Sequence, residues 1–545
     1  MRIALASVLT LGLLASFLFA ILGGLAVLFQ AFDFYIIVGA VVLVNILMWL
    51  VSPRISDITY SWFYDTEWVE LEDLEEMSPA SAEVIREVTE EYDYKTPKLG
   101  VIKDSNPQAF TYGSDRWNAR ILVTEGLFEY LDDNEAASVY AHELGHITNR
   151  DFIIMTIANT IVQLLYLVAV RLYRQALRGD NKDKGGALLV GFAALSYIFY
   201  IIGKYLVYYL SRVREYYADR FAGEHTDPNY LSSALIKISY GIMDSPENKD
   251  LMKATESMGI MNLEQGEEKG AVYYNSSNLE NWDPLAKAFL FDIKNPWASL
   301  LEIKSTHPLT GKRVRALCGQ TEDPIFDFES LKNKFEIDTR KLYRQFFQDL
   351  AVVSVPNILL LTLPVIYLAG IFTGAVPEMH GAALGLWITV LGSGKLVKTA
   401  YKYPIRGEPE ETTVIELLSD IYASPVRASK ARLKGEIIGR GQAGYRFGED
   451  LMMKDETGIM HLRYQSIVPV LGNFWFGWRK AGKLVDQKVE AEGWFLRGTM
   501  PWIGLRRLET HTEDINSWVH IHGLIIGALV LLVGLIVMGV GLAVW

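Results

Sequence analysis

The chain has 545 residues, too many for one ordinary hydrophobic core. Hydrophobic residues make up 50% of it and fall in long blocks, which is typical of membrane proteins. The net charge of -12 opposes nucleic acid as a partner, and the sequence carries no long basic run or RNA-binding signature. The single cysteine, Cys318, cannot form an internal disulfide, so nothing in the chain depends on an oxidising compartment.

Two long apolar runs, residues 3–29 and 35–51, come first. The first run exceeds the roughly 20 residues that a helix needs to cross a bilayer. Arg2 ahead of it also fits a cleaved signal peptide, but the run is longer than a signal-peptide core and the second run follows almost at once. We therefore predict an N-terminal transmembrane hairpin over residues 1–53.

The next two apolar runs, residues 152–170 and 187–203, interrupt a long soluble region. We predict that residues 54–349 form one catalytic domain into which a hydrophobic hairpin at residues 152–203 is inserted. Basic residues stand in the loop between the two runs: Arg171, Arg174, Arg178, Lys182 and Lys184. Because positive loops resist translocation, the sequence leaves open whether this hairpin fully crosses the membrane.

The C-terminal part alternates between membrane and soluble segments. Apolar runs at residues 350–372 and 381–394 predict a transmembrane hairpin over residues 350–394, and a last run predicts a C-terminal helix over residues 519–545. Between them, residues 395–518 contain strand-like pieces around turns, from which we predict a small β-barrel. These pieces are residues 434–438, 451–453, 460–464, 483–495 and 502–508. The barrel's aromatic residues are expected in a core or at a membrane interface: Phe474, Trp475, Phe476, Trp478 and Trp494.

Lysine and arginine residues near the spans predict the orientation. The short turns at residues 30–34 and 373–380 contain neither type of residue. Basic residues gather at the opposite ends of the same spans: Arg2, Arg54, Lys395, Lys398, Lys402 and Arg406. Since positive residues stay on the cytoplasmic side, we predict a multi-pass cell-membrane protein whose catalytic domain faces the cytoplasm and whose partners include the lipid bilayer.

The strongest chemical signal is the H-E-x-x-H sequence His142-Glu143-Leu144-Gly145-His146. Asp132 can cap a helix that contains this motif, and Glu135 stands where a capping box requires an acid. Residues four apart share a helix face, so both imidazoles can bind one tetrahedral metal ion. Glu143 is then placed to act as general base on the attacking water.

A catalytic zinc ion needs a third protein ligand and one open position. The best candidate is Glu215, which lies four residues before Asp219 on one helical face. Asp219 is then expected to accept a hydrogen bond from a ligating histidine. Taken alone, such a pair more often forms solvated salt bridges, but the upstream motif reverses that expectation. We predict one Zn²⁺ per chain, although this ligand set also binds other divalent metals.

These pieces, in this order, resemble the HtpX-type membrane zinc peptidases, relatives of the CAAX prenyl endopeptidases. The order is two apolar runs, Val123-Thr124-Glu125-Gly126-Leu127, the H-E-x-x-H motif, a hydrophobic hairpin, residues 214–220, and Ser305-Thr306-His307-Pro308. The resemblance covers residues 1–317 and implies a mainly α membrane protein, with a zincin-like catalytic domain and a small edge sheet on transmembrane helices. It also implies zinc-dependent endopeptidase activity and a role in protein quality control. The β-rich C-terminal segment lies outside it.

The resemblance implies roles for three further residues. In the family an edge strand binds substrate through backbone pairing, and Ala109 and Phe110 occupy that place, after Gln108 where the family usually has asparagine. An ordinary core strand is an equally good interpretation of these two residues. His307 is expected to position substrate or stabilise the oxyanion, although an isolated His-Pro is usually only a turn.

The predicted function is therefore hydrolysis of peptide bonds in membrane or misfolded proteins. His146 lies six residues before the run that starts at residue 152, so the metal is expected near the bilayer surface, where membrane-protein substrates are accessible. A CAAX-type prenyl-protein endopeptidase is an alternative, but it would need more membrane helices. A non-catalytic membrane scaffold is another, against which the intact motif argues. The oligomeric state is left open, a homo-oligomer included.

Overall fold

The computed structural model describes residues 10–18, 20–21, 32–178, 184–244, 251, 259–261, 266, 269–270, 272–273, 282–375, 377, 379–441, 448–498 and 501–544. The chain divides into two compact units. The first consists of Met1–Gly270 with Leu300–Phe328, and the second of Ala271–Ser299 with Glu329–Trp545. The boundary falls inside the predicted catalytic domain of residues 54–349, whose functional extent stays a prediction.

Five helices are long and apolar enough to cross a membrane. They are Val42–Phe63, Asp151–Leu177, Gly186–His225, Thr339–Phe372 and Val519–Val544. The chain is therefore a mainly helical, multi-pass membrane protein. The predicted hairpin at residues 152–203 falls in two of these helices. Most of the first apolar run, residues 3–29, lies outside the described residues.

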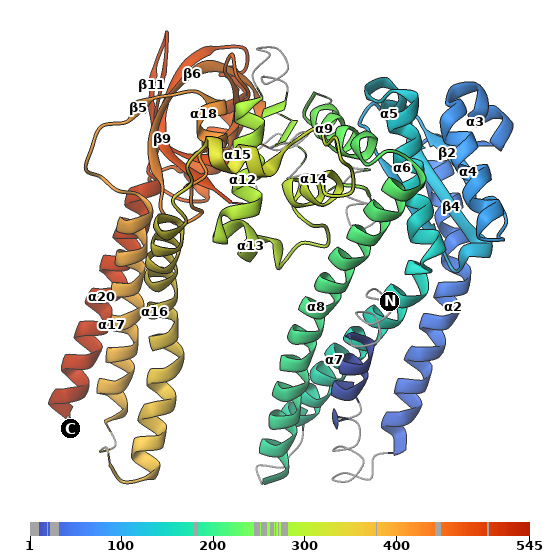
Figure 1. Ribbon diagram of the computed structural model, residues 1–545. Coiled ribbons are helices and arrows are strands. Elements are labelled where there is room, and N and C mark those ends of the chain that lie inside the picture. The colour runs from blue at the N-terminus through green and yellow to red at the C-terminus, as the bar shows by residue number, and fades with distance from the viewer. Residues whose placement is uncertain are drawn as a thin grey trace. The chain divides into compact units, whose positions relative to one another are not determined.

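The first unit joins a four-stranded sheet to membrane helices (Figure 1). Its strands are β1 (Thr66–Val69), β2 (Lys98–Ile102), β3 (Ala109–Gly113) and β4 (Ala119–Thr124). Its helices are α2 (Phe32–Phe63), α3 (Leu71–Met77), α4 (Pro79–Glu91), η1 (Arg116–Asn118), α5 (Glu125–Tyr130), α6 (Asp133–Thr148), α7 (Asp151–Arg178), α8 (Lys184–His225), α9 (Pro228–Asp244) and α14 (Thr310–Cys318). The strand order β1-β2-β4-β3 leaves β3 at one edge, paired antiparallel with β4.

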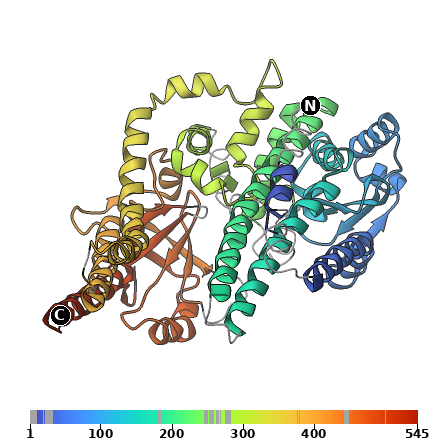
Figure 2. The same cartoon turned by 90° about the horizontal axis from the view of Figure 1, so that it is seen from below.

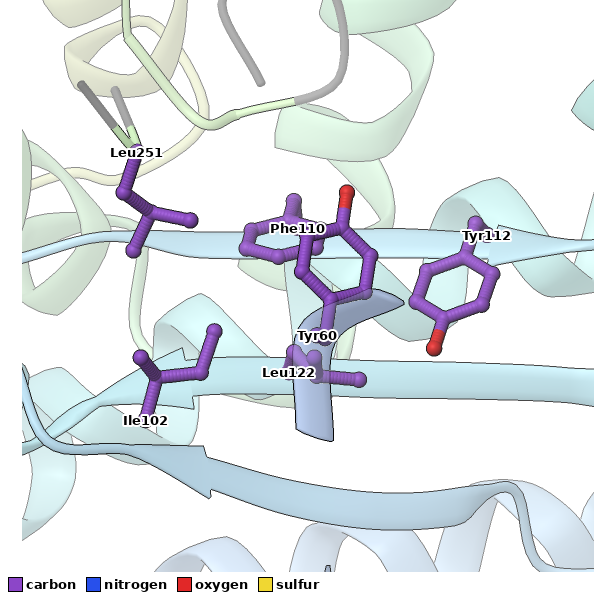
Figure 3. Close-up of a cluster of buried hydrophobic side chains, with 6 residues drawn as sticks. All are labelled: Tyr60, Ile102, Phe110, Tyr112, Leu122 and Leu251. Carbon is purple, nitrogen blue, oxygen red and sulfur yellow. The ribbon is translucent and has the colours of Figure 1, made fainter. Parts of the chain in front are cut away.

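One apolar cluster packs this sheet against α2. Tyr60 of α2 lies over the ring of Phe110 in β3, with their centroids 5.2 Å apart (Figure 3). The cluster also contains Ile102, Tyr112, Leu122 and Leu251. Burial of each such side chain stabilises the fold by about 1.5–3 kcal/mol, so the edge strand is held at a fixed position beside α2.

In the second unit, five strands close into a barrel. Each of β6, β7, β8 and β10 pairs with the next, and β9 pairs with both β10 and β6. Alternate residues of β6, such as Ala431, Leu433 and Ile437, are buried, as a barrel interior requires. The strands are β5 (Glu410–Glu411), β6 (Ser429–Arg440), β7 (Leu451–Lys454), β8 (Ile459–Arg463), β9 (Lys488–Arg497), β10 (Pro501–Thr510) and β11 (Asp514–Asn516). The predicted barrel is thus confirmed, and each predicted strand piece overlaps one of these strands.

The remaining helices of the chain include the C-terminal membrane helices. They are α12 (Asp283–Lys294), α13 (Pro296–Glu302), α15 (Phe328–Lys334), α16 (Thr339–Phe372), α17 (His380–Lys402), α18 (Val414–Leu418), α19 (Leu471–Arg479), η2 (Ala481–Lys483) and α20 (Val519–Val544). Pro356 and Pro364 lie inside a continuous α16. Of the predicted aromatic residues, Phe476 and Trp494 are buried, whereas Phe474, Trp475 and Trp478 are exposed.

Helix α17 packs along the whole length of α20. A Cβ added to Gly385 would lie 2.2 Å from the backbone nitrogen of Met538, and one added to Gly392 would lie 2.3 Å from that of Leu531. The two helices run antiparallel at a distance that only glycine allows at these points. α17 is not among the five apolar helices, but it packs against α20, which is (Figure 2).

Candidate metal centre

The H-E-x-x-H motif lies on α6, and this helix begins after Asp132, the predicted capping residue. The side chain of Asp132 accepts a hydrogen bond from the Glu135 backbone nitrogen, and Glu135 accepts one from the Asp132 backbone nitrogen, each 3.0 Å long. This capping box fixes the first turn. Both Glu135 and nearly every later residue up to Ile147 are buried, so the motif stands on a core helix held from several sides.

The structure brings three potential metal ligands together: His142, His146 and Glu215. The Nε2 atoms of the two histidines are 3.2 Å apart. Glu215, on α8, has one carboxylate oxygen 3.5 Å from His146 Nε2 and the other 3.8 Å from His142 Nε2. Ligands at about 2.1 Å from one tetrahedral ion stand about 3.4 Å apart, so these three groups already have nearly the spacing that a zinc ion requires.

A carboxylate stands behind each imidazole. Asp219 Oδ1 is 3.0 Å from His142 Nδ1, and Asp151 Oδ2 is 2.7 Å from His146 Nδ1. Since a carboxylate can only accept, each Nδ1 carries the hydrogen and each Nε2 offers its lone pair toward the centre. The predicted place of Asp219 agrees with this geometry, and Asp151 supplies a second carboxylate.

An arginine pairs with each of these carboxylates. The guanidinium of Arg313 donates two hydrogen bonds to Asp219, 2.9 Å and 2.6 Å long, and forms an ion pair with Glu215 at 3.7 Å. Arg214 forms an ion pair with Asp151 and donates to the backbone oxygen of Asn149 over 3.1 Å. These arginines compensate the charge of the buried acids and fix the orientation of the carboxylates that hold the imidazoles.

Burial determines the protonation states near the centre. It lowers the pKa of His142 to about 4, although the Asp219 carboxylate acts in the opposite direction. The histidine is therefore neutral at pH 7, which is the form that binds metal. Burial also raises the pKa of Glu143. Neither oxygen of the Glu143 carboxylate has a hydrogen-bond partner among the described residues, although the Thr111 hydroxyl lies nearby.

His307 lies beside the three ligands rather than far from them. Its Nε2 atom is 3.8 Å from Glu215 Oε1, and the side chain is buried. Burial, reinforced by the charge of Arg313, lowers the pKa of His307 to about 3, so this imidazole is neutral as well. The loop that carries it is held by Arg212 of α8, which donates to the backbone oxygen of Ser305 over 2.7 Å.

Ala109 and Phe110 lie on the edge strand, but their part of the edge is already occupied. The backbone oxygen of Ala109 accepts a hydrogen bond from the Ile260 nitrogen over 3.1 Å, and Phe110 bridges to Gly259. The Phe110 side chain belongs to the apolar cluster described above (Figure 3). Beyond Phe110, no described residue pairs with the outer edge of β3 at residues 111–113.

Residues 111–113 of β3 and the metal centre share one cavity of about 640 Å³. Thr111, Tyr112 and Gly113 line it together with His146 and Glu215. A peptide in this cavity can therefore reach both the strand edge and the potential metal ligands.

Two groups of the centre escape prediction from the sequence. Asp151 could have been found, since an acid five residues after His146 is a candidate to accept a hydrogen bond from that ligand. Arg313 gives no local signal, because α14 is distant in sequence from both helices of the motif.

Known proteins show what this arrangement is similar to. Residues 78–321 match the model of peptidase family M48. Over 244 residues the chain is 31% identical to the Protease HtpX homolog of Methanothermobacter thermautotrophicus, and the match covers 44% of this chain and 84% of that protein. The chain belongs to peptidase family M48. The motif-based resemblance is thereby confirmed.

Further M48-type similarities agree with this. Protease HtpX homolog 2 of Methanosarcina mazei is 32% identical over 227 residues, which cover 41% of this chain and 67% of that protein. The crystal structure of S. mikatae Ste24p aligns with 17% identity and a TM-score of 0.33, over 56% of this chain and 62% of that one, which is too slight a likeness to compare folds. With its five candidate spans, the M48 peptidase is a membrane metallopeptidase whose substrates are peptides or proteins.

Proposed function

We propose that the protein is a zinc-dependent endopeptidase that hydrolyses membrane or misfolded proteins at the cytoplasmic face of the cell membrane. The observation that carries this proposal is the convergence of two imidazole Nε2 atoms and the Glu215 carboxylate, each imidazole backed by its own acid. A second observation supports it: the buried Glu143 carboxylate beside them has no hydrogen-bond partner among the described residues. Together with zinc, residues 54–349 would form the zincin-like catalytic domain.

The residues fit zinc in number, type and spacing. Two histidines and one carboxylate form a frequent ligand set for catalytic zinc, and they leave a fourth position open. When bound, zinc polarises a peptide carbonyl and makes water more acidic. His142, His146 and Glu215 would hold it, with Asp219 and Asp151 fixing the histidine tautomers.

Glu143 would move the proton in the reaction. Its carboxylate takes a proton from the water that attacks the peptide carbonyl and then donates this proton to the leaving amine. The raised pKa of Glu143 favours the first step, because a carboxylate with a higher pKa is a stronger base. His307, held neutral at the edge of the centre, would donate a hydrogen bond to the carbonyl oxygen as negative charge develops there.

Substrate would bind along the edge strand. Residues 111–113 lie at the sheet edge next to His146, and no described residue pairs with them on the outer side, so an extended peptide can add to the sheet as a further strand. α6 ends at Thr148 and α7 begins at Asp151, which supports a centre at the membrane surface. The cytoplasmic orientation rests on the distribution of lysine and arginine described above.

The test is reconstitution of the metal-free protein. The chain is purified in detergent with a chelator, and metal content and casein cleavage are measured after zinc is added, beside the Glu143→Gln variant. We expect about one zinc ion per chain in both proteins and a loss of cleavage of about 10²- to 10⁴-fold in the variant. Absence of zinc binding in the wild type would refute the proposal, and zinc binding without cleavage of any test protein would favour the scaffold.

A further inference from the structure

The cavity at the metal centre continues between the membrane helices. Besides His146 and Glu215, its lining includes residues of α2, α7 and α8. On α7 the lining follows one helix face at four-residue intervals, through Asp151, Asn159 and Gln163. One cavity therefore joins the proposed catalytic residues to two amide side chains of a membrane-spanning helix.

These amides lie deep in the span. Gln163 is twelve residues after Asp151, which is about 18 Å along the helix and on the order of half the thickness of a hydrocarbon core. Both Asn159 and Gln163 are exposed, and neither has a hydrogen-bond partner among the described residues. An unpaired amide at this depth has a free-energy cost unless a polar group meets it.

The facing helix carries a third amide. Asn45 of α2 lines the same cavity, and its side-chain oxygen accepts a hydrogen bond from Thr160 of α7 over 3.4 Å. Away from the metal centre the polar lining is neutral: Asn45, Ser52, Ser56, Thr156, Asn159 and Gln163. A neutral lining rich in amides and hydroxyls suits uncharged polar groups rather than ions.

An unwound membrane segment presents such groups. A transmembrane helix must be extended before a peptidase can cleave it, and each peptide group released inside the bilayer then lacks a hydrogen-bond partner. A side-chain amide can donate to a backbone carbonyl and accept from a backbone N–H. The edge of β3 at residues 111–113, with which no described residue pairs on the outer side, meets the same need next to the metal centre.

We propose that Asn159 and Gln163, with Asn45 opposite, form an intramembrane binding site for an unwound stretch of a membrane-protein substrate. The site accepts the substrate backbone inside the bilayer and leads it to residues 111–113 of the edge strand. This inference rests on the proposed function and adds to it the place where the membrane-embedded part of the substrate binds.

The kinetic test compares two forms of one substrate in lipid vesicles. A casein segment that the enzyme cleaves is offered either free or joined directly to a transmembrane helix. In the double variant Asn159→Leu with Gln163→Met, we expect the ratio of kcat/KM for the joined form to kcat/KM for the free form to fall about tenfold, because two hydrogen-bonding groups are lost. Exchange of the amides, Asn159→Gln with Gln163→Asn, should restore most of the ratio.

The matched control is Ile157→Ala on the opposite face of α7, where the side chain is exposed and lies outside the cavity lining. It should leave the ratio unchanged. An unchanged ratio in the Asn159→Leu, Gln163→Met variant would overturn the proposal. An equal loss with both substrates would also overturn it, because the cavity would then supply only water or stability.

A binding test separates this proposal from the proposed function. In the Glu143→Gln background, Gln163 is replaced by the photo-crosslinking amino acid benzoylphenylalanine, and Ile157 is replaced in a parallel sample. Irradiation with the membrane-joined substrate should produce an adduct at position 163 and none at 157. An adduct would support the site even if the wild type cleaved nothing, whereas its absence would overturn the site even for an active peptidase.

Discussion

The two units of this protein pack their apolar helices in different ways. In the second unit, α17 and α20 approach so closely that a Cβ added at Gly385 or Gly392 would overlap the facing backbone. In the first unit, α2, α7 and α8 leave a cavity of about 640 Å³ between them, and amide side chains such as Asn159 and Gln163 line it.

The difference separates anchoring from access. Lipid is as apolar as leucine, so helices in a membrane associate through close packing of small residues, and α17 and α20 use that means to exclude everything between them. Polar side chains between helices have the opposite effect. They can hydrogen-bond to polar groups that enter the space between the helices. We therefore expect changes in the first unit to affect chemistry, and changes in the second to affect stability.

The largest expected effect is in the first unit. His146→Ala removes one of the three potential metal ligands, so zinc binding should be lost and cleavage should fall to the background level, as it should when the wild type is treated with a chelator. Metal content and casein cleavage measure this. Since α6 is held by its capping box and its core contacts, the protein should remain folded, and unfolding of the variant in detergent would contradict this expectation.

The next effect is in the second unit. Gly392→Ala brings a Cβ to 2.3 Å from the Leu531 nitrogen, so α17 and α20 must move apart, at a cost of about 1–3 kcal/mol in the free energy of unfolding. Thermal unfolding in detergent measures it. Gly539→Ala on α20 is the control, because a Cβ there meets nothing within 4 Å. Equal unfolding temperatures for the two variants would show that the glycine contact does not stabilise the unit.

A smaller effect is expected from the acids behind the histidines. Asp151→Asn should weaken zinc binding about 10- to 100-fold, because the amide holds the tautomer of His146 less firmly and leaves Arg214 without its charge partner. Competition with a zinc-binding dye measures the affinity. Asp133→Asn, in the first turn of α6 and away from the metal ligands, should bind zinc like the wild type. A wild-type affinity in the Asp151 variant would show that the acid does not orient the histidine.

The sequence predicts the parts of each region that depend on local pattern. The cap at Asp132, the spacing of His142 and His146, and the strand pieces of the barrel are local, so each could be recognised. The sheet order that places β3 at an edge depends on distant pairings. So does the contact of Arg313 with Asp219, which joins α14 to α8.

The helix packing in the two units could be predicted from the sequence only in part. The glycines of α17 and α20 show a small-residue pattern, but only the structure shows that they face each other. The amides of α7 give little signal in the sequence, because charge is the usual mark of a polar path through a membrane. Asparagine and glutamine carry no charge, so the path appears only when the helix face and the cavity are known.

The smallest effect concerns the barrel, where pH should act on stability alone. Burial raises the pKa of Asp450, whose carboxylate accepts a hydrogen bond from the Tyr464 nitrogen over 3.0 Å. An acid with a raised pKa in the folded state makes the protein less stable as the pH rises from the usual pKa of aspartate, about 3.9, to the raised value. Asp450→Asn removes this loss and keeps an oxygen that can accept the same hydrogen bond.

We therefore expect Asp450→Asn to raise the unfolding temperature slightly at pH 7 and to have little such effect at about pH 3, where the acid is mostly protonated in both states. Thermal unfolding at several pH values measures this. Casein cleavage should follow the same pH profile in the variant and in the wild type, since the proposed catalytic residues all belong to the first unit. A changed pH profile for cleavage would show that the barrel influences the metal centre, and the contrast between an anchoring unit and a catalytic unit would no longer hold.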